Sequence, residues 1–240
     1  RRLSEPSAKE RARAILRDLP PNVPSVDELR SKQILAEYGI PILKEQFAVT
    51  REEAVQTADA LGYPVALKIV SPDISHKTEA GGVELELFDS ASVRSGFDRM
   101  MANVKRNRPE ALIEGVVVQQ MASRGIEMVL GARVDPQFGP LVAVGFGGTL
   151  VEILRDTVIR LAPIDLSQAM KILASLRGYP LLQRYRGGPA TDLDALAQAI
   201  TRFSELVADN ADLLQEVDVN PLIANGSGSI CVDALIVKKS

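Results

Sequence analysis

Apolar and polar residues alternate along the chain with two different periods, and these periods predict both strands and helices. From Val83 to Leu87 the period is two, since Val83, Leu85 and Leu87 are separated by Glu84 and Glu86. Successive side chains of a strand point to opposite faces, so this stretch predicts a strand with one buried and one solvated face. Elsewhere apolar positions recur every three to four residues, which is the period of a helix with one buried face.

Capping boxes mark the starts of two predicted helices. Ser25 with Glu28 has the Ser/Thr-x-x-Glu spacing, in which each side chain accepts a hydrogen bond from the other residue's backbone N–H. Thr50 with Glu53 repeats this spacing. The predicted helices run from these boxes to Gly39 and Gly62, and over 90–105, 166–177 and 192–209, the last capped by Thr191 with Asp194.

The remaining apolar runs predict strands, and their order along the chain indicates the fold class. They do not alternate regularly with helices, and the last two form a hairpin around Asn225-Gly226-Ser227-Gly228. The sequence therefore predicts an α+β protein and not a doubly wound fold. The predicted strands are 64–70, 83–88, 116–118, 126–134, 141–144, 158–161, 216–223 and 229–237.

Residues 1–24 are expected to be a linker or tail that precedes an ordered domain of residues 25–240. Ala8–Arg17 has the composition of a short basic helix, and the prolines at 20, 21 and 24 would stop its continuation. The chain begins with Arg1 and not with Met. Together with this tail, that start favours a segment of a longer fused polypeptide over a separate subunit.

The composition excludes several classes of protein. Hydrophobic residues make up 46% of the 240 residues and charged residues 25%, and the net charge is −3 with both signs interspersed. This balance is typical of a globular protein that binds neither nucleic acid nor a membrane surface. No apolar run approaches the ~20 residues of a membrane span, no signal peptide is visible, and Cys231 is the single cysteine. A cytoplasmic location is therefore expected.

The stretch between Lys68 and Gly82 carries the first candidate chemistry. Lys68 interrupts an apolar strand, so its ammonium must reach water or meet an anion. Gly81-Gly82 would let backbone N–H groups approach a phosphate as an anion-binding nest. His76, the only histidine, lies between them, and a neutral imidazole is a competent nucleophile toward a phosphoryl group. Taken singly, Lys68 also fits a lysine at a sheet edge, and His76 fits a solvated loop side chain.

Several motifs in this stretch resemble the ATP-grasp half of the ADP-forming (NDP-forming) acyl-CoA synthetases. They are Lys68, Ser71-Pro72-Asp73-Ile74, His76-Lys77 and Ala80-Gly81-Gly82-Val83, and the resemblance extends over about residues 26–238. The succinyl-CoA synthetase β chain has a similar diglycine loop without the histidine. In the ADP-forming acetyl-CoA synthetases the histidine that matches His76 is phosphorylated and relays phosphate to ADP.

The resemblance implies an α+β ATP-grasp fold, with two α/β lobes and the nucleotide bound between them. The small lobe would cover about residues 46–111, and the large lobe residues 25–45 plus 112–240. Backbone groups of Gln119, Gln120 and Met121 would hydrogen-bond the adenine of ATP or ADP, and a plain edge strand is the alternative. Glu127 matches an acidic residue at the nucleotide site, and Lys44 is a weaker candidate for a nucleotide contact.

A second glycine cluster, Gly145, Gly147 and Gly148, follows a predicted strand. It does not open a helix as the dinucleotide-binding fingerprint does, which excludes that motif. It resembles the glycine loop that ATP-grasp synthetases place against the phosphates, although a tight turn uses the same residues. After the loop come, at helical spacing, Glu152, Asp156 and Arg160, which are either site residues or a ladder of charges along a helix.

The terminal hairpin carries a candidate metal site. Asp218 and Asn220 are two residues apart on a predicted strand and therefore share a face. Asp233 would lie opposite Asn220 if the hairpin turned at Gly226-Ser227, and opposite Asp218 if it turned at Asn225-Gly226. Either register gathers three oxygen-bearing side chains, and Mg²⁺ is held by such ligands together with substrate phosphates. The succinyl-CoA synthetase β chain has a similar strand as its Mg²⁺ site, and the alternative is a solvated hairpin face.

The function implied by the resemblance is phosphoryl transfer between His76 and ADP. The overall reaction of the family is acyl-CoA + ADP + phosphate giving carboxylic acid + CoA + ATP. No motif resembles the CoA-binding and ligase domains, so these are expected as partners, either in the same chain or as a separate α subunit, with an oligomer as the full-length state. Two alternatives stay open: a non-catalytic regulatory domain of a protein lysine acetyltransferase, and an ATP-dependent carboxylate–amine ligase.

Overall fold

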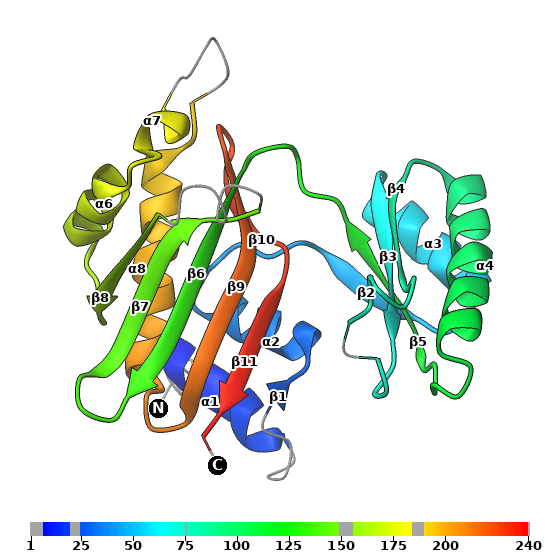
Figure 1. Cartoon of the computed structure of the whole chain (residues 1–240), viewed down its shortest axis with the longest axis horizontal. Coiled ribbons are helices and arrows are strands. Elements are labelled where there is room, and N and C mark those ends of the chain that lie inside the picture. Colours follow the sequence, from blue (N-terminus) through cyan, green and yellow to red (C-terminus); the bar gives the residue numbers. More distant parts are fainter. Residues whose placement is uncertain (1–6, 20–24, 75, 149–155, 184–189, 240) are drawn as a thin grey trace, which may run out of the picture. The chain divides into compact units, whose positions relative to one another are not determined.

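The computed structural model describes residues 7–19, 25–74, 76–148, 156–183 and 190–239. The chain folds as two compact units (Figure 1). The first unit consists of residues 1–42 and 123–240, and the second consists of residues 43–122. Each unit has its own hydrophobic core. Among the described helices, none has the length and apolar character needed to cross a bilayer.

The first unit is built on an antiparallel sheet in the order β1-β11-β9-β6-β7-β8, with β10 also paired to β9. β9 and β6 form the centre of this sheet, and their alternate residues are buried. Val217 and Val219 point to the core, while Glu216, Asp218 and Asn220 point to the other face. The strands are β1 (Ser25–Val26), β6 (Ile126–Asp135), β7 (Gly139–Phe146), β8 (Thr157–Leu161), β9 (Leu214–Asn225), β10 (Gly228–Cys231) and β11 (Ala234–Lys238).

The described helices of the first unit gather on one face of this sheet, and they leave the other face open (Figure 1). The core between helices and sheet contains large apolar side chains such as Ile34, Met128 and Phe203. Burial of this apolar surface is the main favourable contribution to folding. The open face is therefore the side on which a ligand can reach the strands. The helices are α1 (Ala8–Asp18), α2 (Glu28–Glu37), α6 (Leu166–Ser175), α7 (Tyr179–Leu182) and α8 (Leu193–Asp209).

Helix α1 corrects the expectation that residues 1–24 form a linker or tail. Its Ala12 and Leu16 are buried in the core of the first unit. Ser7 and Glu10 form a capping box at its start, and Arg11 is ion-paired with Glu37 of α2. The basic residues of this segment look solvated in the sequence, but Lys9, Arg11 and Arg13 form ion pairs with acidic residues that are distant along the chain. Residues 1–6 and the proline-rich stretch 20–24 lie outside the described residues.

The second unit is a four-stranded antiparallel sheet with two helices packed on one face. The strand order is β2-β5-β3-β4, and the core contains Leu67, Ile69, Met100 and Val104. The capping box of Thr50 with Glu53 at the start of α3 is confirmed. The elements are β2 (Glu45–Ala48), α3 (Arg51–Leu61), β3 (Val65–Val70), β4 (Val83–Leu87), α4 (Ser90–Asn107) and β5 (Gly115–Gln120).

This unit is wider than the small lobe expected over about residues 46–111. Strand β5 was expected in the large lobe, but it pairs with both β2 and β3 and is therefore the second strand of this sheet. The unit boundary consequently lies after Ala122. Hydrogen-bond partners decide to which unit a strand belongs, and these partners are distant in sequence.

Two predicted caps are also corrected. Ser25 belongs to β1, and Asp27 caps α2 by accepting a hydrogen bond from the Arg30 N–H. Asp192, and not Thr191, caps α8 through the Ala195 N–H. Asp and Ser are about equally good caps, so the choice between neighbouring candidates depends on where the chain enters the helix.

The alternation predicted for β4 is broken in the structure. Leu85 is 58% exposed although it was expected to be buried, and Glu84 is ion-paired with Arg99 of α4. The cause is an irregularity in the pairing of β3 with β4, next to which Glu86 adopts a φ of +56°. An extra residue in one strand of a pair shifts the following side chains to the opposite face. Leu87, beyond the irregularity, is buried as expected.

Candidate functional site

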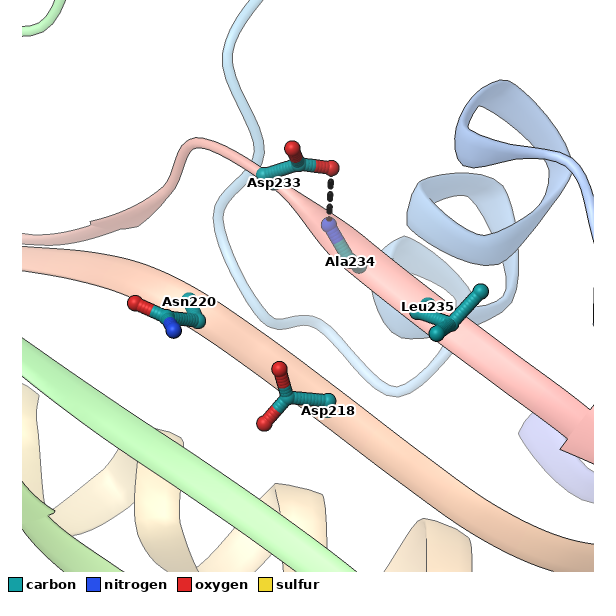
Figure 2. A pocket seen from close by; sticks show the side chains of 5 residues that line it. All are labelled: Asp218, Asn220, Asp233, Ala234 and Leu235. Carbon is teal, nitrogen blue, oxygen red and sulfur yellow. Dashed lines mark hydrogen bonds between the residues drawn. The ribbon is translucent and has the colours of Figure 1, made fainter. Parts of the chain in front are cut away.

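Asp218, Asn220 and Asp233 lie together on the open face of the first unit. The hairpin turns at Gly226-Ser227, because Gly228 pairs with Asn225. This register places Asp233 opposite Asn220, and the Asn220 N–H donates to the Asp233 carbonyl at 3.1 Å. Figure 2 shows the three side chains around one pocket, with Asp218 and Asn220 on β9 and Asp233 just before β11. Two registers were compatible with the sequence, and the structure has the one that turns at Gly226-Ser227.

The pocket has the donor set and the electrostatics of a cation site. Asp218 is partly buried, and burial together with the charges of Glu216 and Asp233 raises its pKa above the ordinary value. The mutual repulsion of carboxylates would be relieved by a cation. The pocket volume is about 140 Å³. Since a liquid water occupies about 30 Å³, this volume fits a small cation with a few waters or phosphate oxygens.

The residues fit Mg²⁺ in particular. The described parts of the chain contain no cluster of three or more His, Cys, Asp or Glu side chains suited to a metal. The pocket therefore offers two carboxylates and one amide oxygen, and other ligands must complete the shell. Mg²⁺ is commonly bound in this way, by one or two carboxylates plus substrate phosphates, and it is not usually held in a cage made only of protein ligands.

Gly131 is a residue of this pocket's surroundings that the sequence analysis missed. It pairs with Asp218 across β6 and β9, and a Cβ added to it would lie 3.9 Å from Asp218 Oδ1. A side chain at this position would project over the open face beside the carboxylate. A glycine in the interior of a strand is the signal that could have identified it.

His76 lies on an exposed loop between β3 and β4. Its carbonyl accepts a hydrogen bond from the Ala80 N–H at 3.2 Å, and its side chain is exposed to solvent. Asp73 anchors the start of the loop by accepting the Leu112 N–H at 2.8 Å. The imidazole is therefore accessible to a phosphoryl group, while hydrogen bonds at Asp73 and Ala80 hold the described parts of the loop.

The anion nest expected at Gly81-Gly82 is absent in this conformation. The Gly82 N–H donates to the Lys77 carbonyl at 2.8 Å, and the Gly81 N–H donates to the Thr78 carbonyl at 3.0 Å. Both amides are therefore engaged within the loop. Each glycine has a different structural reason instead. Gly81 has a φ of +74°, a backbone conformation that favours glycine, and a Cβ on Gly82 would overlap Ile69 of β3.

Substitution of Gly82 by Ala is expected to destabilise the second unit by about 1–3 kcal/mol, the usual cost of overpacking. The added methyl would have to displace Ile69, a fully buried core residue. The free energy of unfolding from urea titration measures the effect. Gly96→Ala is the matched control, since its Cβ would meet the flexible Leu87 side chain at 3.1 Å and a helix interior favours Ala. A Gly82→Ala protein as stable as the control would contradict this packing argument.

Lys68 lies on the open face of the second unit's sheet. It pairs with Val83 and Val117, and Phe47 lies in the same row across the sheet. Lys68 is partly buried, and its neighbours in this row are apolar. On the neighbouring row, Gln119 is buried and its amide donates to the Glu45 carboxylate at 2.6 Å. Glu45 was not predicted, because no motif or period in the sequence marks it.

The expected adenine segment is part of the regular sheet. The Gln120 N–H donates to the Lys44 carbonyl at 2.9 Å, and the Met121 N–H donates to the Pro64 carbonyl at 3.0 Å. These two amides are therefore engaged in the fold. The Met121 sulfur in turn accepts the Glu86 N–H at the irregularity of β4. The Lys44 side chain is exposed.

The second glycine cluster packs against Glu127. The Gly147 N–H donates to the Glu127 carbonyl at 2.7 Å, and a Cβ on Gly148 would overlap the Glu127 carboxylate. A Cβ on Gly145 would lie 2.7 Å from the Asp156 carbonyl. The structure thus brings Glu127 and these glycines together. Residues 149–155, which include Glu152, lie outside the described residues.

The interpretation of Asp156 and Arg160 as part of a charge ladder on a helix is wrong, because Thr157–Leu161 is strand β8. Asp156 is buried just before this strand and accepts the Gly178 N–H at 2.8 Å. Its contact is structural, since it satisfies a buried donor. Arg160 lies within β8 and donates to the carbonyl of Ile159.

Comparisons with known proteins show to which family the chain belongs. An ATP-grasp domain family matches residues 23–237. The chain is 39% identical over 210 residues to the β subunit of an ADP-forming acetate–CoA ligase of Pyrococcus furiosus, covering 88% of this chain and 90% of the relative. It is 37% identical to the ADP-forming 4-hydroxybutyrate–CoA ligase of Nitrosopumilus maritimus, covering 87% of this chain and 30% of that one.

A solved structure is similar along almost the whole chain. It is an acetyl-coenzyme A synthetase of Ca. Korarchaeum cryptofilum in complex with coenzyme A and Mg-AMPPCP, with its phosphohistidine segment pointing towards the nucleotide binding site. The identity is 33%, the TM-score is 0.83, and the match covers 95% of this chain and all (100%) of that chain.

The fold and the family match define the molecule as an ATP-grasp protein, a class whose members bind nucleotides. Within that class the chain belongs to the ADP-forming acyl-CoA synthetases, which are acid–thiol ligases. The comparisons favour this family over a regulatory domain of an acetyltransferase and over a carboxylate–amine ligase.

Proposed function

We propose that this chain carries out the nucleotide half of acyl-CoA synthesis, the transfer of a phosphoryl group between His76 and ADP. Toward ATP, the P–N bond of phosphohistidine breaks and a P–O bond to the terminal phosphate of ADP forms. The ring nitrogen keeps the electron pair and the imidazole returns to its neutral form. In the reverse direction the same nitrogen attacks the γ-phosphorus of ATP.

The observation that carries this proposal is the pocket of Asp218, Asn220 and Asp233, which combines two carboxylates with an amide oxygen on an open sheet face. These residues would hold Mg²⁺, which would neutralise phosphate charge when bound. Little covalent chemistry is required of the protein in phosphoryl transfer, so positioning and charge neutralisation dominate. Lys68, Glu127 and the glycines at 145, 147 and 148 are assigned to nucleotide and phosphate contacts.

The other half of the reaction is assigned to partner domains. The N. maritimus relative, of which this chain covers 30%, and the P. furiosus β subunit, of which it covers 90%, support two ways of supplying them. In both, the acyl group and CoA would be handled outside the present residues, and a phosphohistidine would carry the phosphoryl group between the two halves.

Mg-ADP binding by the chain itself tests the nucleotide site. Lys68→Met is expected to weaken Mg-ADP about 10- to 100-fold, because it removes one charge-assisted hydrogen bond to a phosphate. Isothermal titration calorimetry measures the dissociation constant. Lys105→Met, at an exposed position of α4, removes the same charge elsewhere in the unit and should leave the constant unchanged. Equal affinities for both variants would remove Lys68 from the site.

A further inference from the structure

The pair of Val232 and Pro221 lacks one of the two hydrogen bonds of an antiparallel ladder. The register of β9 with β10 and β11 places the two residues opposite each other, and the Val232 N–H donates to the Pro221 carbonyl at 3.0 Å. In a hydrogen-bonded pair the partner residue returns the bond with its own N–H. Proline has no N–H, so Pro221 cannot return it. The carbonyl of Val232 must find its donor elsewhere.

Lys32 of α2 supplies that donor. Its Nζ donates to the Val232 carbonyl at 3.2 Å and to the Glu28 carboxylate at 3.0 Å. The Lys32 side chain is 0% exposed, while that of Glu28 is 19% exposed. Burial of an ammonium is costly unless its protons are used in good hydrogen bonds. The burial of Lys32 is therefore explained by its hydrogen bonds to the Val232 carbonyl and the Glu28 carboxylate.

Val232, to which Lys32 donates, is the residue before Asp233. Val232 and Asp233 form the interval between β10 and β11, and Asp233 lines the pocket (Figure 2). On one side of Asp233 its carboxylate accepts the Ala234 N–H at 2.8 Å. On the other side, the bond from Lys32 fixes the carbonyl of the peptide that joins Val232 to Asp233. The direction of the Asp233 side chain depends on the orientation of this peptide.

We infer that Lys32 is a positioning residue for Asp233, and through Asp233 for the divalent cation. The inference rests on the proposed function, in which Asp233 is a metal ligand. The Asn220-Pro221 step supplies the ligand Asn220 and at the same time removes a ladder donor beside Asp233. The ammonium of Lys32 replaces this donor from the helix side of the sheet.

The test separates the anchoring bond from the stability of the buried ion pair. Lys32→Met is expected to raise the Mg²⁺ concentration needed for half-maximal ADP binding about tenfold, within the range of residues that orient a metal ligand. The affinity for ADP without metal should not change. Calorimetric titrations at several Mg²⁺ concentrations, with a thermal unfolding midpoint for each variant, give both quantities.

Two further variants keep the test decisive if Lys32→Met folds poorly. Glu28→Gln disturbs the same buried pair but leaves the Lys32–Val232 bond, so it should lower stability with little effect on the Mg²⁺ requirement. The double variant Glu28→Met/Lys32→Met replaces the pair by apolar residues, a change that is often neutral or stabilising. It should fold and still show the tenfold higher Mg²⁺ requirement.

A double variant with the wild-type Mg²⁺ requirement would overturn the inference. Ser204→Ala serves as a control for stability alone, because it removes a buried hydroxyl that bonds to Ile164, on the helix side of the same unit. Asp233→Asn separates the proposed metal site from the proposed role of Lys32. If it leaves the Mg²⁺ requirement unchanged, the proposed metal site fails; if it raises the requirement and the lysine variants do not, only the role of Lys32 fails.

Discussion

Substitution of His76 by Ala is expected to reduce ATP formation from acyl-CoA, ADP and phosphate by on the order of 10⁴-fold or more, as loss of a covalent catalytic group does in other enzymes. No other histidine is present in the 240 residues to take over the phosphoryl group. The assay uses the chain together with its CoA-binding and ligase partner domains. Labelling with ³²P gives a second measurement, since phosphohistidine is labile to acid, and the label should vanish in the variant.

Asp73→Ala is the matched control for this result. It removes the carboxylate that anchors the loop through the Leu112 N–H but leaves the imidazole in place. We expect a slower reaction with the acid-labile label still on His76. If His76→Ala retained a rate close to that of Asp73→Ala, or if the label appeared on another residue, the relay through His76 would be excluded.

Substitution of Asp218 by Asn is expected to weaken Mg-ADP binding by at least about 100-fold, the upper range for residues that only support a metal ligand. The same change is expected to stabilise the metal-free protein at neutral pH. Burial and the charges of Glu216 and Asp233 raise the pKa of Asp218 above its ordinary value of 3.8, so the folded state disfavours the ionised carboxylate. An amide of the same shape carries no charge to repel.

The sign of the pH effect follows from the direction of this shift. A carboxyl whose pKa is higher in the folded than in the unfolded state destabilises the fold most above the folded pKa. The penalty disappears as the pH falls through the raised pKa toward 3.8. The stability difference between the Asp218→Asn variant and the wild type, measured by thermal unfolding in EDTA, should therefore shrink on acidification.

Asn220→Ala is the control that separates the two effects of Asp218. It removes a proposed ligand oxygen without removing a negative charge, so it should weaken Mg-ADP binding and leave the metal-free protein no more stable than the wild type. A gain in stability for Asn220→Ala equal to that for Asp218→Asn would show that repulsion between carboxylates is not the cause.

The pocket of Asp218, Asn220 and Asp233 shows how far local sequence pattern predicts structure. Asp218 and Asn220 share a face because strand geometry fixes the direction of every second side chain, and this was predicted from two positions in the sequence. Which of them faces Asp233 depended on the turn, and two registers were compatible with the sequence. Pairing of Gly228 with Asn225 decided the question. A change of turn by one residue alters every pair along a hairpin.

The diglycine loop shows the opposite case. The diglycine pair predicted a nest of amides at Gly81-Gly82, but these amides donate to the Lys77 and Thr78 carbonyls. The irregularity that exposes Leu85 and the membership of β5 in the second unit also depend on partners far away in sequence. No local period encodes such partners.

The sequence by itself determined the class of protein, the α+β character, most helices and strands, and the residue types of the proposed phosphoryl-transfer site. These properties depend on periodicity, capping and short motifs, which act within a few residues. The tertiary structure alone decided the integration of α1 into a core, the register that joins Asn220 to Asp233, and the bond from Lys32 to the Val232 carbonyl opposite Pro221. Such features arise from contacts between residues up to 200 positions apart, and only the folded chain brings those residues within hydrogen-bonding distance.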